Sequence, residues 1–245
     1  MIATIDSERI KLMSTRSPYW CVAIVAVLGL GLAALISSGG PVDELTDNPA
    51  NVYLLGVNQF GLAVLLIMAV LGITTEYRFG TIRLSFEATP RRWQVLVAKG
   101  VVFAIVGLVV TFVICLLGLV IAKLFAGDDF DLTSSDAIRQ LWGTPIFIAL
   151  AMLIGVAVGA LIRQTAGAVT IVLVWTLLVE TVVIPLLPKV GEPVVPFLPF
   201  TNGWRFLTGD TGDFHWNIYG SLVYFALVAL VILGAAIAVV NKRDA

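Results

Sequence analysis

Six long apolar stretches constrain this chain more than any other feature, because each is nearly free of charge in its middle. A helix needs about 20 such residues to cross a bilayer. We expect these helices at residues 18–38, 52–73, 96–124, 142–162, 166–187 and 217–240. Hydrophobic residues make up 59% of the chain and charged residues 13%, whereas a soluble domain has roughly 45–50% and 25%. The sequence therefore predicts an all-α membrane protein with six transmembrane helices and one domain, residues 1–245.

The basic residues predict how the helices are oriented, because Lys and Arg accumulate in short cytoplasmic loops. With the N-terminus inside, eleven of the fifteen basic residues fall on the inner side: Arg9, Lys11, Arg16, Arg78, Arg83, Arg91, Arg92, Lys99, Arg163, Lys242 and Arg243. Four fall on the outer side: Lys123, Arg139, Lys189 and Arg205. We therefore expect a multi-pass protein of the plasma membrane with both termini in the cytoplasm.

The segment before the first stretch, residues 1–17, has four apolar residues near one helical face: Ile2, Ile5, Leu12 and Met13. This pattern favours a short amphipathic helix on the membrane surface. A frayed terminus with ordinary basic anchors is the alternative. The apolar stretch that follows is longer than the core of a signal peptide, which has about 7–15 residues. We expect it to be retained.

The segment between the second and third stretches predicts a helix, a break, a short helix, a second break and another helix. Gly80 is expected to end the first helix, and Thr81 to cap the short helix "IRLSFEA". Ile82 and Phe86 are i, i+4 neighbours on an apolar face of that helix. Two charged residues flank this face: Arg83 and Glu87. A plain loop would not need this architecture.

The second break is Thr89-Pro90, an expected N-cap followed by Pro at the first helical position. It opens the helix "RRWQVLVAKG", which continues into the third stretch. Arg91 and Arg92 at its start can anchor the membrane surface or contact a soluble partner. The segment as a whole predicts a rigid cytoplasmic knob joined to two membrane helices.

Two further regions have distinctive backbones. Gly155 and Gly159 form a GxxxG pattern in the fourth stretch, which lets two helices approach closely. Residues 188–216 are too apolar for a solvated loop, and three prolines forbid a regular helix through their middle: Pro193, Pro196 and Pro199. We expect a re-entrant or surface-lying element before the sixth helix, covered by protein.

Glu180 is the one carboxylate inside a predicted span. Ionisable residues in the membrane are costly and suggest function. Glu180 can contact substrate or a proton, or it can have a structural or interfacial role, reaching the outer interface or pairing with Arg205. Polar or aromatic groups in spans tend to face protein, so the candidates for a substrate path are Asn58, Trp142, Gln164, Trp175 and Glu180.

No pattern in the chain predicts enzymatic chemistry. It lacks G-x-x-x-x-G-K-[ST], HExxH, CxxC and G-x-S-x-G. His215 is the single histidine and has no evident partner, so we expect no metal site. Cys21 and Cys115 lie at different membrane depths and are not expected to pair. No basic patch interleaved with aromatic residues indicates nucleic acid.

Two segments resemble the ABC-2-type permeases of bacterial transporters, especially the small bacitracin- and daunorubicin-resistance-like exporters. "EYRFGTIRLSFEATPRRWQVLVAK" is similar to their cytoplasmic segment between the second and third helices, roughly E-Y-R-x-G-T-I-R…A-T-P-R-R…K. "SERIKLMSTRSPYW" resembles the S-E-x-x-K-L-x-S-x-R-S segment before their first helix. With six spans, the resemblance covers the whole chain. Phe79 departs from it, because relatives often have a polar residue there.

The resemblance implies that residues 81–88 are a coupling helix docking on a separate ATPase, and that residues 4–16 are a surface connecting helix. Residues 188–216 would be the external element. The residues expected to couple to the ATPase are Glu76, Tyr77, Arg78, Gly80, Thr81, Ile82, Arg83, Phe86, Glu87, Pro90 and Arg91.

The resemblance also implies a function: the permease subunit of an ATP-binding cassette exporter in the bacterial plasma membrane, of the multidrug-resistance type. Its cargo would be a hydrophobic small molecule, a lipid or a peptide. Two ATPase subunits would hold ATP and Mg²⁺, a second permease, identical or homologous, would complete the path, and this chain would hold no cofactor. The alternatives are a membrane scaffold or sensor whose knob docks a signalling partner, and an ion-coupled carrier using Glu180.

Overall fold

The computed structural model describes residues 1–39, 46, 48–89, 91–127, 130–187, 191–212 and 214–242, without the side chain of Glu192. Within these ranges every regular element is a helix. Six helices are long and apolar enough to cross a membrane: α2 (Ser17–Ser38), Gly56–Phe79, α6 (Arg92–Ala126), α7 (Ser135–Ile162), Thr165–Val183 and α11 (Ile218–Lys242). The predicted all-α membrane fold with six spans is confirmed.

Two of the spans are composite. The second begins as a π-helical segment, Gly56–Gly61, and continues as α4 (Leu62–Phe79). The fifth begins as α8 (Thr165–Val174) and ends as a second π-helical segment, Trp175–Val183. The second span therefore extends beyond the predicted residue 73, and the fifth ends before the predicted residue 187.

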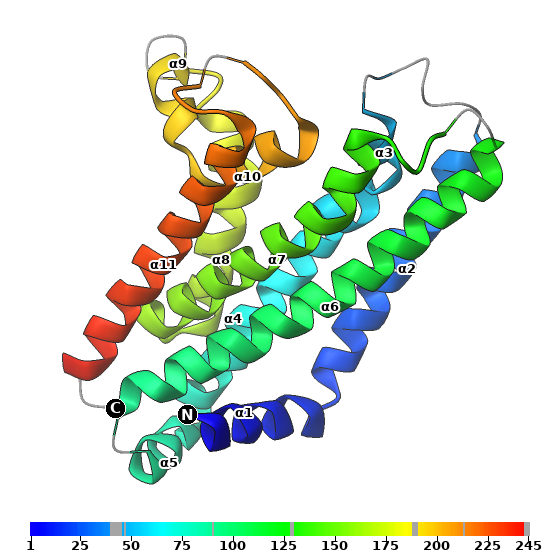
Figure 1. The fold of residues 1–245 in the computed structure, drawn as a ribbon. Coiled ribbons are helices and arrows are strands. Elements are labelled where there is room, and N and C mark those ends of the chain that lie inside the picture. Colours follow the sequence, from blue (N-terminus) through cyan, green and yellow to red (C-terminus); the bar gives the residue numbers. More distant parts are fainter. Residues whose placement is uncertain are drawn as a thin grey trace.

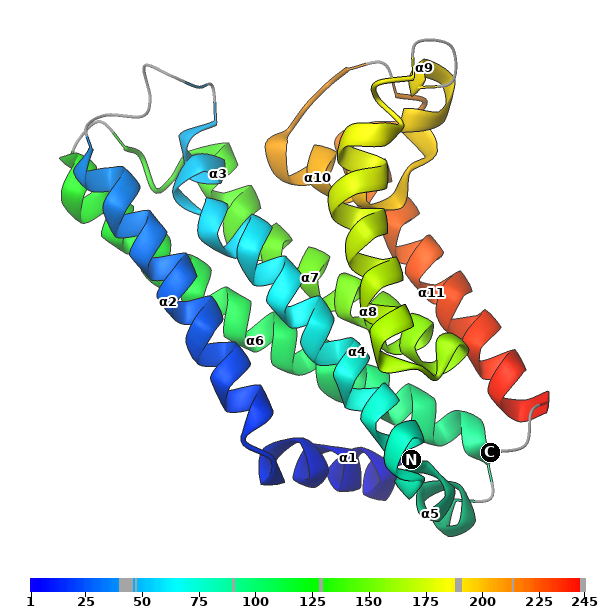
Figure 2. The same cartoon turned by 180° about the vertical axis from the view of Figure 1, so that it is seen from behind.

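Shorter helices lie at the two ends of the bundle (Figures 1 and 2). At one end, α1 (Ile2–Ser14) lies across the spans beside α5 (Thr81–Ala88), and α11 finishes at the same end. At the other end are α3 (Pro49–Tyr53), α9 (Gly191–Val194) and α10 (Pro199–Thr208). Of the basic residues used to predict orientation, Lys189 and Arg243 lie outside the described residues.

The segment before the sixth span packs against protein, as predicted. Pro199 occupies the first turn of α10, where its missing N–H costs no helical hydrogen bond. Phe200, Phe206 and Leu207 of α10 are buried, and α10 contacts α11 and α7. Residues 188–190 and Asp213 lie outside the described residues.

The short helix predicted in residues 1–17 is present as α1, and its four apolar residues divide between two environments. Ile5 and Leu12 are half-buried against the bundle, but Ile2 and Met13 are exposed. The one fully buried side chain of α1 is Glu8. The inward side of this helix is therefore organised around a charge, which the count of apolar positions could not indicate.

The centre of the bundle is the contact between α4 and α7. Most residues of the second and fourth spans are buried, whereas no more than about a third are buried in each of the other spans. Gly155 and Gly159 of α7 face α4, as the GxxxG pattern predicts for a close helix pair. A Cβ at Gly155 would lie 3.1 Å from the Cβ of Ala69, and one at Gly159 would overlap Cγ2 of Ile73. The absence of side chains at these positions sets the distance between the two helices.

We expect Gly159→Ala to destabilise the protein by about 1–3 kcal/mol, the usual cost of overpacking a close contact. Gly234→Ala is the matched control, because a Cβ there meets no atom within 4 Å and alanine is the better helix former. Thermal unfolding in detergent should show a lower midpoint for the first variant only. Equal midpoints would contradict the close contact.

Candidate functional site

The short helix α5 projects from the bundle between two membrane helices, as predicted. Gly80, with φ 71°, is both the C-cap of α4 and the N-cap of α5. This left-handed conformation suits glycine, which has no Cβ to clash. It turns the chain sharply, so that Gly80 alone separates the end of α4 from the start of α5.

The faces of α5 agree with the sequence prediction. Ile82 is buried, and Phe86 is half-buried against the core. Arg83 and Glu87 are exposed, as is Leu84, whose exposed fraction is 66%. Arg92 lies over the Phe86 ring, 5.6 Å from its centroid. One side of α5 is thus fixed to the bundle, and the other side is free to contact a partner.

Both predicted caps of this region are wrong. Thr81 makes no N-cap; its hydroxyl lies 3.5 Å from the Glu76 carbonyl oxygen, and Gly80 holds the cap position. Thr89 is the C-cap of α5 rather than the N-cap of α6, which is Arg91 in extended backbone. Pro90 lies outside the described residues. Both breaks between helices are present. The left-handed Gly80 makes the first, and the extended residues Thr89 and Arg91 flank the second.

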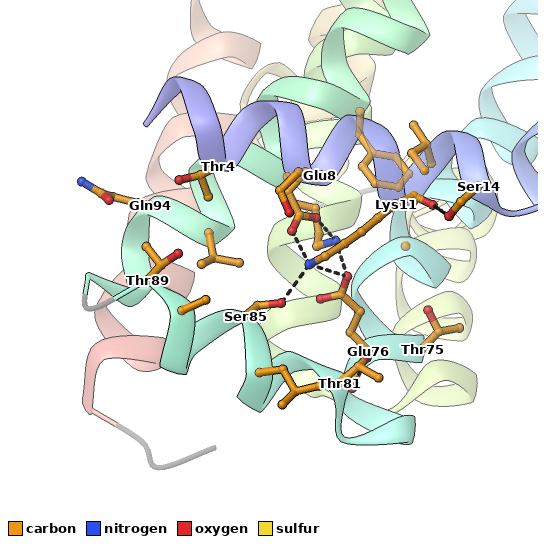
Figure 3. Close-up of a pocket in the computed structure, with 18 of the residues that line it drawn as sticks. Thr4, Glu8, Lys11, Ser14, Thr75, Glu76, Thr81, Ser85, Thr89 and Gln94 are labelled. Carbon is orange, nitrogen blue, oxygen red and sulfur yellow. Dashed lines mark hydrogen bonds and ion pairs between the residues drawn. The ribbon is translucent and has the colours of Figure 1, made fainter.

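Between α1 and α5, four charged side chains from three helices form a cluster that we call the ion cluster: Glu8, Lys11, Glu76 and Lys99. Figure 3 labels the first three of them. Lys99 of α6 donates to Glu8 of α1 and, at 2.9 Å, to Oε1 of Glu76 at the end of α4. Lys11 of α1 donates to Oε1 of Glu8 at 2.6 Å. It also donates to the Ser85 hydroxyl of α5 at 2.8 Å.

The ion cluster is electrically balanced, with two carboxylates and two ammonium groups. Glu8 and Lys99 are each about 3% exposed, so each depends on its partner for the interactions that water would otherwise supply. Burial lowers the pKa of Lys11, but the hydrogen bond and charge of Glu8, with those of Glu76, outweigh it and raise the pKa above its ordinary value. Lys11 is therefore charged at neutral pH, and its contribution to stability is lost only as the pH rises through that pKa.

A second contact joins the α5 end of α4 to the turn between α7 and α8. Arg163, in that turn, lies over the ring of Tyr77, 5.0 Å from its centroid. It has φ 59°, a strained conformation for a residue with a side chain. The Thr165 hydroxyl donates to the Thr74 hydroxyl at 3.0 Å. The base of α5 is thus held to the fourth and fifth spans as well as to the third.

The other residues singled out by sequence lie elsewhere. Asn58 is buried, and its amide nitrogen donates to Asn51 and Gln140, both at 3.1 Å. Its oxygen accepts from Thr144 at 3.0 Å. Trp142 packs edge-on against Phe206. Asn58 therefore joins the second and fourth spans inside the bundle.

Glu180 caps α10 from the π-helical segment of the fifth span. Its Oε2 accepts from the backbone N–H of Thr201 at 2.9 Å, and its Oε1 accepts from the Trp175 indole. A carboxylate at a helix N-terminus satisfies an unpaired N–H and complements the helix dipole. The structural role is favoured over substrate contact, because the Glu180 side chain is buried. Gln164 and Trp175, two other candidates for the substrate path, are exposed.

The predicted pairing of Glu180 with Arg205 is wrong. Arg205 donates to the Trp216 carbonyl oxygen at 2.8 Å and to the Ser221 hydroxyl at 2.7 Å. Its guanidinium lies over the Phe214 ring, 4.1 Å from the centroid. Arg205 thus fastens α10 to the start of α11, while Glu180 fastens it to the fifth span.

Sequence reasoning missed Glu8, Lys11 and Lys99 as members of the site. Lys99 offered a signal, because it stands inside an apolar stretch and a charge there needs a partner. Among the described residues, no group of three or more His, Cys, Asp and Glu side chains could hold a metal ion. Cys21 and Cys115 are free, as predicted.

These features define an all-α, multi-pass membrane protein with a partly exposed helix fixed by buried charges at one end. The chain belongs to the family described as protein of unknown function (DUF2705), whose model matches residues 33–245. No curated protein matches the chain. The family match includes Glu76, α5 and Lys99, whereas α1 precedes it.

We expect Lys99→Met to destabilise the protein by about 3–5 kcal/mol, the cost of removing one partner of a buried ion pair. Two carboxylates then face Lys11 alone. The double variant Glu8→Gln with Lys99→Met should recover part of the loss, because it restores the charge balance. Denaturant unfolding in detergent measures both effects.

The matched control is Arg9→Gln, because Arg9 pairs with Asp6 at 3.7 Å in an exposed position. Exposed pairs contribute little, so this variant should stay within about 0.5 kcal/mol of the parent. A loss for Lys99→Met no larger than the control's would rule out the structural importance of the ion cluster.

We expect Glu180→Ala to raise the hydrogen-exchange rate of the Thr201 amide about tenfold or more, because a charge-assisted hydrogen bond is lost. Glu180→Gln keeps a carbonyl oxygen and should show a smaller increase. Exchange measured by mass spectrometry on peptides covering 199–208 tests this. Unchanged exchange in the alanine variant would exclude the capping role.

Proposed function

We propose that this chain is the permease subunit of an ATP-binding cassette transporter of the ABC-2 type. Two permeases, identical or homologous, would enclose a path, and two separate ATPase subunits would bind ATP and Mg²⁺. The chain would sit in the bacterial plasma membrane with α1, α5 and both termini in the cytoplasm. It would export a hydrophobic small molecule, lipid or peptide.

The observation that carries this proposal is the construction of α5. An eight-residue helix outside the spans offers exposed Arg83, Leu84 and Glu87. Phe79, just before it, is 71% exposed. The apolar side chains of Phe79 and Leu84, with charges of both signs beside them, suit a specific protein contact. In such a contact the apolar groups supply affinity and the charges fix the register.

The attachment of α5 suits the transfer of force. The buried Ile82 and the Lys11–Ser85 hydrogen bond prevent α5 from moving independently of α1 and the bundle. A displacement by a partner is therefore carried to α4 and α6 through Glu76 and Lys99. It also reaches the fourth and fifth spans through Tyr77 and Arg163.

The chain supplies no nucleotide-binding pattern of its own, so hydrolysis falls to the partner and the chain is not an enzyme. The residues that would line the substrate path belong to the same proposal. Trp175 and Gln164 are exposed and could face a second permease, whereas the polar atoms of Asn58 are used inside the bundle.

We expect charge reversal at Arg83→Glu or Glu87→Lys to lower ATP-driven transport at least about tenfold while ATP hydrolysis by the assembled complex continues, because misplaced charges break the register of docking. The measurement is transport and hydrolysis side by side in proteoliposomes. Lys242→Glu is the control, since Lys242 is exposed at the same end of the bundle on another helix.

Affinity purification of the full chain tests the partner itself. An ATPase with a Walker A sequence should co-purify, and its turnover should change on assembly. If a signalling protein without ATPase activity is recovered instead, and both reversal variants release it, the scaffold alternative replaces this proposal.

A further inference from the structure

A cavity of about 900 Å³ opens between α1 and the helices α4, α5 and α6 (Figure 3). The function proposed above does not use it. Gly72 and Phe103 line it from within apolar spans, while Thr81 and Thr89 line it from the two ends of α5, beyond the spans. The cavity therefore crosses the depth at which the apolar interior of a membrane gives way to its headgroups.

The lining changes character along that depth. Next to the spans, its walls include the apolar residues Val95 and Phe103. Hydroxyl side chains make up part of the remainder, among them Thr4, Ser7, Ser85 and Thr89. Hydroxyl groups donate to phosphate oxygens, and an apolar end accepts the start of an acyl chain. The lining thus matches a phospholipid at the membrane surface.

The charges of the lining indicate which headgroup fits. They are the four members of the ion cluster, two of each sign. A balanced set gives no excess of positive charge to select an anionic lipid, so a zwitterionic headgroup is favoured.

Within the cluster, Oε2 of Glu76 is buried and accepts no hydrogen bond from the described residues. The last torsion of a glutamate is soft, so this oxygen can turn towards a donor in the cavity. An unpaired buried carboxylate oxygen calls for an N–H group, which a primary ammonium has and a choline lacks.

We propose that this cavity binds a phospholipid whose headgroup ends in a primary ammonium, of the phosphatidylethanolamine class. The ammonium donates to Glu76, and the phosphate accepts from hydroxyl groups of the wall such as Thr4 and Thr89. The bound lipid would hold α1 against α5. Of the exposed docking residues of α5, Arg83 and Glu87 lie outside this lining, whereas Leu84 belongs to it. Lipid binding can nevertheless be measured on the chain without an ATPase partner.

The test is native mass spectrometry of the full-length protein in detergent with synthetic lipids of one acyl composition. Phosphatidylethanolamine, its mono- and dimethyl derivatives, phosphatidylcholine and phosphatidylglycerol are compared. Affinity should fall as N–H donors are removed, to about tenfold weaker for phosphatidylcholine. Soluble glycerophosphoethanolamine should bind more weakly than the lipid, because it lacks acyl chains.

Three variants locate the site. Glu76→Gln should abolish the preference for the ethanolamine headgroup. Ser7→Phe adds bulk to the cavity wall and leaves all four charges of the ion cluster in place, so it should remove binding even if Glu76→Gln fails to fold. Asp6→Asn, on the exposed side of the same helix, should bind like the parent.

Equal affinity for all headgroups would overturn the proposal, as would undiminished binding to Ser7→Phe. A lysine or arginine of a partner protein seated in the cavity of the purified complex would also overturn it. Equal binding of the soluble headgroup would reject the membrane lipid as the ligand.

Discussion

The buried pairing of Glu8 with Lys99 is the interaction on which the α5 end of the molecule depends. Apart from this charge, α1 offers the bundle only half-buried residues, so its position follows from the electrostatic requirement of Lys99 rather than from apolar burial. Once α1 is placed, Lys11 donates to the Ser85 hydroxyl and so fixes α5 to α1. Removing one charge would leave the others uncompensated, which makes α1, α4, α5 and α6 a single unit.

The rest of the bundle is rigidly joined to this end, because the helices at its centre are closely packed. The α4 and α7 backbones approach so closely at Gly155 and Gly159 that neither helix can shift without the other. At the opposite end, Glu180 and Arg205 fasten α10 to the fifth and sixth spans. Both ends of the bundle are therefore held by polar contacts, while glycine residues let the helices pack closely at its centre.

The sequence predicts the spans, α5 and its buried face because these depend on local hydrophobic patterns. It cannot predict the ion cluster in the same way, since Glu8 and Lys99 stand 91 residues apart and meet only through the fold. The caps of α5 were mispredicted for a local reason: threonine favours caps, but the left-handed Gly80 had already ended one helix and begun the next. The sequence predicts Glu180 near the outer surface or paired with Arg205, but its side chain is buried and accepts from the Thr201 N–H at the α10 N-terminus, a contact that only the fold creates.

The charges at this end of the molecule divide into two groups with different physics. Arg83 and Glu87 are exposed, so salt screens them within about 8 Å at physiological ionic strength. They suit recognition, which must be reversible. Glu8 and Lys99 are removed from water, and salt hardly weakens their attraction. They suit a permanent attachment. The proposed function would need both kinds of contact on opposite sides of α5. Arg83 and Glu87 lie on its exposed side, and Ser85 contacts Lys11 of the ion cluster on the other.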